Sequence, residues 1–479
     1  RGTRKEVALS GVRQEYFYIC VQKMQEDFDA FLNQLFIDGV SQDTLTLNYT
    51  LKNKKIYGLD NLEVSFGNAN EDEQHSMYSV YENTKATLRS FDYDKLTKSR
   101  QFMYDLAEYM VDLKLESSKY QGYDEFLSET SGVQAQLPVL LVEYNFYTIK
   151  DVEDYIKLLN IVPDYFNDIM EYEKFKVKKG LFMSDASADL VIKQCNAFIK
   201  NTENNYLITT FEKRLANLQG LNKQTKSEFI SQNKSVVVNK VIPAYRNLID
   251  GLNALRGTGK NNGGLCGFEN GKKYYEYLAK VKTGSDKSIN EMEILTDKKL
   301  KEAQKKISEI IAKDSKVYEN AINVKYKYTE PKEVIEHLKD AMKDDFPTLP
   351  DDINYQVKYV DSSLEESLSP AFYLTPAIDN YNNNVVYLNG NKKYDLSKAF
   401  TTIAHESYPG HLYQNCYFYS KSPSPFRSIV NIGGYVEGWG TYAELYSYSL
   451  AGLTKNVASF LKTNTLLTLA IYAKVDLEV

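Results

Sequence analysis

The chain is poor in histidine, tryptophan and cysteine. Its 479 residues include four histidines, one tryptophan and four cysteines. The cysteines are scattered and form no CxxC pair, which excludes a zinc-ribbon or dithiol redox motif, and their even number permits disulfides without implying any; they are Cys20, Cys195, Cys266 and Cys416. No apolar run reaches the roughly 18 residues that a membrane-spanning helix needs.

The sequence also lacks an excess of charge of one sign. It has 58 basic and 64 acidic residues, interspersed, for a net charge of −6, so nothing indicates a nucleic-acid-binding surface. There is no internal repeat and no low-complexity tract. The length leaves room for one large enzyme or for two or three domains. The chain begins at Arg1 without a secretory signal sequence, and we expect a trimmed or mature form.

Two of the four histidines lie in one seven-residue segment, His405-Glu406-Ser407-Tyr408-Pro409-Gly410-His411. A neutral imidazole binds zinc, and a His–Glu pair followed by a second histidine is typical of one-zinc hydrolases. In such a site zinc activates a water molecule and a glutamate takes its proton. We therefore predict that His405 and His411 are zinc ligands and that Glu406 is the catalytic general base.

The spacing of the two histidines differs from the usual zinc helix. Histidines at i and i+4 face one metal, whereas a separation of six places the second about 240° round an unbroken helix. Pro409 and Gly410 lie between them, and both residue types interrupt helices. A break there would turn His411 back toward the metal. The alternative is that a helix simply ends at Tyr408 and His411 begins an unrelated segment.

Two helices flank the proposed site. Asp395 or Ser397 is expected to cap the first, whose apolar stripe lies opposite His405 and consists of Leu396, Phe400, Ile403 and Ala404. The second is expected from about residue 435 to 450, with Gly452 as its stop. Gly438 and Gly440 inside it indicate close approach to a neighbouring backbone.

Two glutamates of the second helix compete for the metal. Glu437 and Glu444 share a helix face about 10 Å apart, so one metal cannot bind both. We expect Glu437, beside the glycines, to be the third zinc ligand and water to be the fourth. Glu444 would then accept a hydrogen bond from a ligand imidazole, or be a surface acid. Cys416 is a candidate soft metal ligand, but a buried thiol is favoured.

The His405–His411 segment, together with Glu437-Gly438-Trp439-Gly440-Thr441-Tyr442-Ala443-Glu444, resembles the bacterial family catalogued as domain of unknown function 885. The resemblance covers about Tyr355 to Val479, and upstream it rests on looser features such as residues 270–275. It implies a zinc peptidase distantly similar to thermolysin-like and thimet-oligopeptidase-like enzymes. Many members are lipoproteins, which implies an extracellular or cell-envelope location. Members usually continue beyond the position of Val479.

The rest of the chain is expected to be mainly helical. Residues 1–250 show apolar positions at helical spacing, in one stripe of Phe28, Phe31, Leu35 and Phe36 and another of Leu207, Phe211, Leu215 and Leu218. Seven glycines in residues 251–271 indicate a linker or loop. A helix is expected from about residue 287 to 313. His75 and His337 are expected to be exposed.

Three short strands are expected within residues 355–389. Tyr355, Val357 and Tyr359 alternate with polar residues, and Tyr373-Leu374 and Val385–Asn389 are further extended runs. In thermolysin-like enzymes such a strand edges the cleft and pairs with substrate. The resemblance suggests that role for residues 385–389, with a purely structural strand as the alternative.

The predicted fold is therefore mainly α with a small β-sheet (α+β), comprising a thermolysin-like catalytic part (residues 272–479, with zinc helices in 395–450) and a helical N-terminal part, with a cleft between them. The predicted function is a peptidase with one Zn²⁺ ion and a peptide substrate. Tyr373 and Tyr435 are candidate oxyanion donors. The alternatives are a zinc hydrolase of a non-peptide amide, or a non-catalytic surface-binding protein; Glu406 argues against the second, since binding needs no general base.

Overall fold

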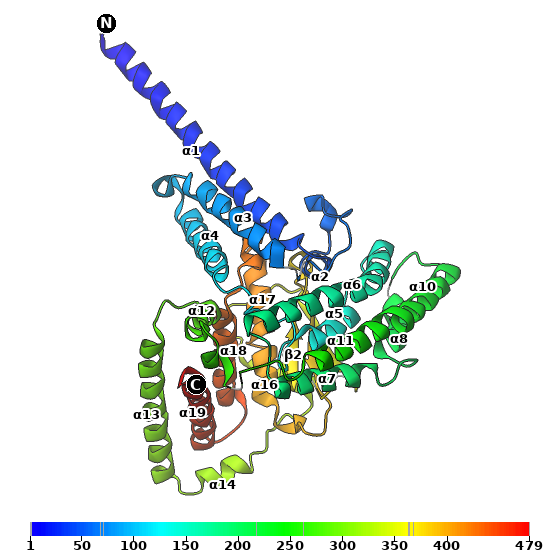
Figure 1. Cartoon of the computed structure of the whole chain (residues 1–479). Helices are drawn as coiled ribbons and strands as arrows, with labels where there is room; N and C mark the ends of the chain where they lie inside the picture. The colour runs from blue at the N-terminus through cyan, green and yellow to red at the C-terminus, as the bar shows by residue number, and fades with distance from the viewer. Residues whose placement is uncertain are drawn as a thin grey trace.

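The computed structural model describes residues 2–67, 69, 71–216, 218–261, 263–362, 365–366 and 368–478, with side chains omitted for residues 2–18 and 71–76. His75, which we expected to be exposed, lies outside the described side chains. The fold is mostly helical with one small sheet (Figure 1), as the sequence predicts. None of the described helices is long and apolar enough to cross a membrane.

Helices form most of the first 255 residues. They are α1 (Gly2–Val40), α2 (Thr44–Thr50), α3 (Glu71–Arg89), α4 (Lys98–Ser117), α5 (Val133–Val142), α6 (Ile149–Lys179), α7 (Asp185–Ile199), α8 (Tyr206–Thr209), α9 (Phe211–Leu215), α10 (Lys223–Val236) and α11 (Ile242–Leu255). The long helix α6 begins with a capping box made by Thr148 and Asp151, which satisfies N–H groups that the first turn leaves free.

The predicted apolar stripes form cores in this part. Phe28 and Phe36 are fully buried, and Leu207, Phe211 and Leu215 are at most 1% exposed. The second stripe is divided between the short helices α8 and α9 instead of lying on one helix. After α11 the glycine-rich segment contains a short 3-10 turn, Gly264–Gly267, and ends where α12 begins at Gly271.

The remaining helices belong to the second half of the chain. They are α12 (Gly271–Thr283), α13 (Ile289–Lys313), α14 (Val317–Ile322), α15 (Pro331–Ala341), α16 (Phe400–Glu406), α17 (His411–Ser420), α18 (Gly433–Ser447) and α19 (Lys455–Glu478). Helix α13 packs alongside α19 (Figure 1). His337 on α15 is half-buried, because its ring stacks on Tyr328 and its Nε2 lies 2.8 Å from the carbonyl oxygen of Leu450. The expectation that it is exposed was wrong.

The sheet has three strands, all within the predicted region: β1 (Asn354–Tyr359), β2 (Ala371–Leu374) and β3 (Asn383–Leu388). Their order is β1-β3-β2, with β3 parallel to β1 and antiparallel to β2. The strand at residues 385–389 is therefore central, and both of its edges are already paired. The suggestion that it pairs with substrate is wrong, and the free edge next to α16 belongs to β2.

The sheet separates two hydrophobic cores. Val386 and Leu388 of β3 are fully buried in the core that contains Phe400 and Ile403 of α16. Tyr387 between them is buried in the larger core of the N-terminal helices. Because successive side chains of a strand point to opposite faces, one strand joins the two halves of the molecule.

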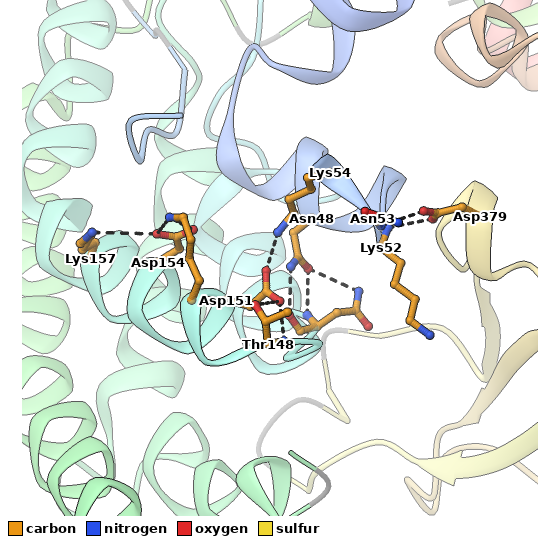
Figure 2. Close-up of polar contacts among 11 residues, drawn as sticks. Asn48, Lys52, Asn53, Lys54, Thr148, Asp151, Asp154, Lys157 and Asp379 are labelled. Carbon is orange, nitrogen blue, oxygen red and sulfur yellow. Dashed lines mark hydrogen bonds and ion pairs between the residues drawn. The ribbon is translucent and has the colours of Figure 1, made fainter. Parts of the chain in front are cut away.

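Polar contacts also tie the loop between β2 and β3 to the N-terminal helices (Figure 2). The backbone N–H groups of Lys52 and Asn53 donate to the two carboxylate oxygens of Asp379 at 2.8 and 2.7 Å. Nearby, the partly buried ammonium of Lys54 pairs with Asp151 at the start of α6. This loop follows the edge strand β2, so its attachment helps to position that strand.

Candidate metal centre

His405 points away from the core because the opposite face of helix α16 is buried. Phe400, Ile403 and Ala404 are at most 1% exposed, whereas His405 lies on the side that faces α18. The helix begins at Phe400. Asp395, expected to cap it, instead accepts from Ser397 at the start of a separate 3-10 turn, Leu396–Lys398. The predicted cap was therefore wrong, while the predicted buried face was correct.

The segment between the histidines is a compact break. Helix α16 ends at Glu406 and α17 begins at His411, with a cis peptide bond between Tyr408 and Pro409. The N–H of Gly410 donates to the carbonyl oxygen of Ala404 at 3.1 Å. A Cβ at residue 410 would lie 1.9 Å from the carbonyl oxygen of His405, so glycine is required there. A new helix does start at His411, as in the alternative interpretation, yet it starts beside His405.

Three side chains converge at this point. The rings of His405 and His411 lie 4.7 Å apart. Oε2 of Glu437 lies 3.4 Å from Nε2 of His405 and 3.7 Å from Nε2 of His411. Two ligands of a tetrahedral zinc ion lie about 3.4 Å apart. The two imidazoles and the carboxylate therefore fit one zinc ion in both chemistry and spacing.

The other nitrogen of His405 faces the second glutamate of α18. Oε2 of Glu444 lies 3.4 Å from Nδ1 of His405. A carboxylate in this position fixes the tautomer that leaves Nε2 free for a metal. Of the two roles that the sequence left open for Glu444, the geometry favours support of the ligand imidazole over that of a surface acid.

The carboxylate of Glu406 is held beside these groups by the edge strand. Its Oε2 accepts a hydrogen bond of 2.8 Å from the backbone N–H of Tyr373 on β2. Burial raises the pKa of Glu406 to about 7, although His405 and this N–H act in the opposite direction. A buried carboxylate with a pKa near neutrality has the proton affinity suited to a general base.

The two imidazoles differ in their electrostatic surroundings. Burial alone would lower the pKa of His405, but Glu444, Glu406 and Glu437 together raise it above its ordinary value. Burial and the neighbouring His405 lower the pKa of His411. A proton therefore binds His405 in preference to His411. The two rings lie beside three carboxylates, and a divalent cation would balance the charge of this site.

Residues 57–479 match the profile of a family described as "Bacterial protein of unknown function (DUF885)". The chain belongs to this family. No curated protein matches it in sequence. The resemblance seen in the two sequence motifs is confirmed at the level of family membership, over most of the chain.

Two solved structures share the fold of this DUF885 chain. A candidate lipoprotein from Colwellia psychrerythraea is 17% identical with a TM-score of 0.80, and the match covers 95% of this chain and 83% of that one. A candidate lipoprotein of unknown function from Shewanella oneidensis is 16% identical with a TM-score of 0.59, covering 93% and 82%. At this identity the likeness concerns the fold alone.

Other side chains singled out from the sequence do not point into the candidate metal centre of this DUF885 chain. The hydroxyl of Tyr373 donates to Oδ1 of Asn384 at 2.6 Å and accepts from Asn415, so it is not free to act as an oxyanion donor. Tyr435 is 62% exposed and lies about 160° round α18 from Glu437. Cys416 is buried and its thiol donates to the carbonyl of Tyr381, as expected of a structural thiol. All four cysteines are free.

Sequence reasoning missed two contacts that shape the site. One is the backbone hydrogen bond from Tyr373 to Glu406, which no sequence pattern signals. The other involves Trp439, whose indole N–H donates to the carbonyl oxygen of Pro409 at 2.8 Å and so holds the break between α16 and α17. The chain has one tryptophan. Its position two residues after Glu437 was the sequence feature that could have indicated a role in the site.

Proposed function

We propose that this protein is a zinc-dependent peptidase with a thermolysin-like arrangement of its catalytic residues. The observation that carries the proposal is the convergence of His405, His411 and Glu437, whose ligand atoms all lie within 4.8 Å of one another, beside the buried carboxylate of Glu406. Two imidazoles, one carboxylate and a neighbouring general base make up the residue set of a one-zinc hydrolase.

Each residue has a distinct role in this proposal. His405, His411 and Glu437 hold the ion, and Glu444 orients the ring of His405. A bound zinc ion would supply Lewis-acid activation of a water molecule. Glu406 accepts a proton from that water as the water oxygen attacks the peptide carbonyl, and then passes the proton to the nitrogen of the leaving amine. The C–N bond breaks, and a carboxylic acid and an amine result.

The edge strand β2 supports a peptide as the substrate. No further strand of the described residues pairs with its outer edge, and the N–H of Tyr373 on that edge reaches Glu406. An extended peptide that adds to a sheet edge is held by main-chain hydrogen bonds. A substrate lying along β2 would therefore pass directly over the proposed general base. We propose β2 for the role first suggested for β3.

We also propose that the protein acts at the cell envelope. Both structural relatives are described as candidate lipoproteins, and lipid attachment places a protein at a membrane surface without a spanning helix. Recovery of the native protein from fractionated cells would test this proposal. Enrichment in the membrane fraction would support it, whereas recovery in the cytosolic fraction would contradict it.

The proposed activity is tested with the variant Glu406→Gln. Its amide cannot accept a proton from water, so hydrolysis of a broad peptide library should fall by at least about 100-fold, in line with the contribution of general base catalysis. Zinc content, measured by atomic emission, should remain near that of the unchanged protein. Glu330→Gln, at the exposed residue that precedes α15, is the matched control. Full peptidase activity in Glu406→Gln, or no bound zinc in either protein, would refute the proposal.

A further inference from the structure

A cavity lies between α15, the loop that follows it and the segment around Tyr408 and Tyr413. It has a volume of about 220 Å³ and opens to solvent on one side. Its walls are largely apolar and come from α15, the following loop and the break before α17; they include Met342, Phe346, Leu349, Ile353, Tyr408 and Tyr413. Lys339, Lys343 and Asp351 also line it, and all three are exposed.

This cavity is separate from the proposed catalytic site. Tyr413 follows His411 by two residues on α17 and so points about 160° away from it. Trp439 has the same relation to Glu437 on α18, and its ring packs on Tyr413 and Phe346 at centroid distances of 6.4 and 6.2 Å. The wall residue Tyr413 therefore lies on the face of α17 opposite His411, and Trp439 packs between α18 and the cavity wall.

One lysine and one aspartate at the cavity have no ion-pair partner among the described residues. The ammonium of Lys339 lies 5.9 Å from the ring centroid of Tyr408 and has no ion-pair partner among the described residues. Asp351 also has none within that part of the chain. By contrast, Lys343 is paired with Asp340 at 2.6 Å. One uncompensated cation and one uncompensated anion therefore border an apolar space.

We propose that this cavity binds a free α-amino acid with an apolar side chain. A cavity of about 150 Å³ accommodates a benzene ring, so the observed volume suits a leucine or phenylalanine side chain while its backbone atoms remain at the opening. Lys339 would bind the carboxylate and Asp351 the ammonium. A phosphate or other polyanion is disfavoured by Asp351, and a neutral hydrocarbon would leave both charges unused. The site does not depend on the proposed peptidase activity.

The position of Trp439 supplies a direct measurement. It is the sole tryptophan of the chain and packs against two residues of the cavity wall, so its fluorescence should respond to an occupant. We expect a saturable change on titration with L-phenylalanine. Lys339→Met and Asp351→Asn should each weaken binding by about tenfold, the effect of losing one charged hydrogen bond. Lys332→Met and Asp344→Asn, exposed positions that do not line the cavity, are the controls and should bind normally.

Two analogues test the assignment of the head group. 3-Phenylpropionate lacks the ammonium and phenethylamine lacks the carboxylate, and each should bind about tenfold more weakly than phenylalanine. Equal binding of all three would show that only the apolar body is recognised and would overturn the assignment. Calorimetric titration accompanies the fluorescence. Absence of heat with millimolar phenylalanine and leucine, or binding unaffected by both cavity variants, would also overturn it.

Discussion

The imidazole of His405 lies against the bare backbone of Gly440. A Cβ at residue 440 would be 2.5 Å from Nε2 and 2.7 Å from Cε1 of that ring, closer than nonbonded atoms approach. The missing side chain lets α18 lie against His405, with Glu437 one turn before and Glu444 one turn after. One glycine thereby allows both glutamates to face the same histidine.

We predict that Gly440→Ala disrupts the metal centre. The new methyl group must displace the ring of His405, so zinc affinity should fall by at least the roughly 10–100-fold typical of a lost supporting contact. The matched control is Gly438→Ala on the same helix, where a Cβ would meet nothing within 4 Å. That variant should keep its zinc and gain about 1 kcal/mol of stability from the helix propensity of alanine. Calorimetric zinc titration and urea unfolding distinguish the two, and equal zinc affinities would contradict the prediction.

The break between the histidines should be equally sensitive. In Gly410→Ala the methyl group meets the carbonyl oxygens of His405 and Ala404, and a backbone cannot rotate away as a side chain can. We expect His411 to move and zinc affinity to fall although no ligand is changed. Replacement of Pro409-Gly410 by Ala-Ala should have at least the same effect, because it also favours continuous helix. Unchanged zinc content in both variants would show that these residues do not set the position of His411.

The two glutamates of α18 should differ in their effect on zinc. Glu437→Ala removes a proposed ligand and should give nearly zinc-free protein. Glu444→Ala removes a contact to the far nitrogen of His405 and should retain zinc with affinity reduced roughly 10–100-fold. Zinc content after extensive dialysis, measured side by side, tests the ranking. The reverse order would make Glu444 the ligand.

Trp439 should stabilise the metal centre through the carbonyl of Pro409. Trp439→Phe keeps an aromatic ring but loses the indole N–H, and one neutral hydrogen bond contributes about 1 kcal/mol. Zinc affinity should therefore fall by about fivefold. Tyr442→Phe, an exposed position on the same helix, should leave zinc affinity unchanged. An affinity in Trp439→Phe equal to that of the control would indicate that the ring packing alone holds the break.

Stability should depend on pH through Glu173 of α6. This side chain is fully buried, neither carboxylate oxygen has a hydrogen bond to a described residue, and Lys176 lies 4.0 Å away. Burial raises the pKa of Glu173 to about 7, with Lys176 opposing the shift. In the unfolded chain a glutamate carboxyl has a pKa near 4.3. Between the unfolded and folded pKa values the folded state therefore binds more protons than the unfolded state, and the free energy of unfolding falls as pH rises.

This group should contribute a loss of roughly 2–3 kcal/mol in unfolding free energy between pH 5 and pH 8. Glu173→Gln cannot ionise and should lack that part of the pH dependence. Urea unfolding of both proteins at the two pH values gives the comparison. Glu171→Gln, an exposed acid on the same helix, is the control and should follow the unchanged protein. Parallel pH profiles for Glu173→Gln and the unchanged protein would contradict the prediction.

Local sequence patterns determined much of the fold and the candidate residues of the metal centre. The helical spacing of Phe400, Ile403 and Ala404 predicted which face of α16 is buried, and the alternation at residues 355–359 predicted a strand. The histidines with Pro409 and Gly410 predicted a broken zinc-binding segment. These signals depend on residues within one or two turns of one another, where periodicity and turn chemistry act directly.

The tertiary structure alone decided the relations between distant segments. Strand order placed β3 in the centre of the sheet and β2 at an edge, because residues 354–359 pair directly with residues 383–388 although β2 lies between them in the sequence. Packing of α18 on α16 brought Glu444 to the far nitrogen of His405. Packing also turned the hydroxyl of Tyr373 into the interior and His337 against the carbonyl of Leu450. Each outcome depends on which segments meet in space, and local periodicity carries no information about that choice.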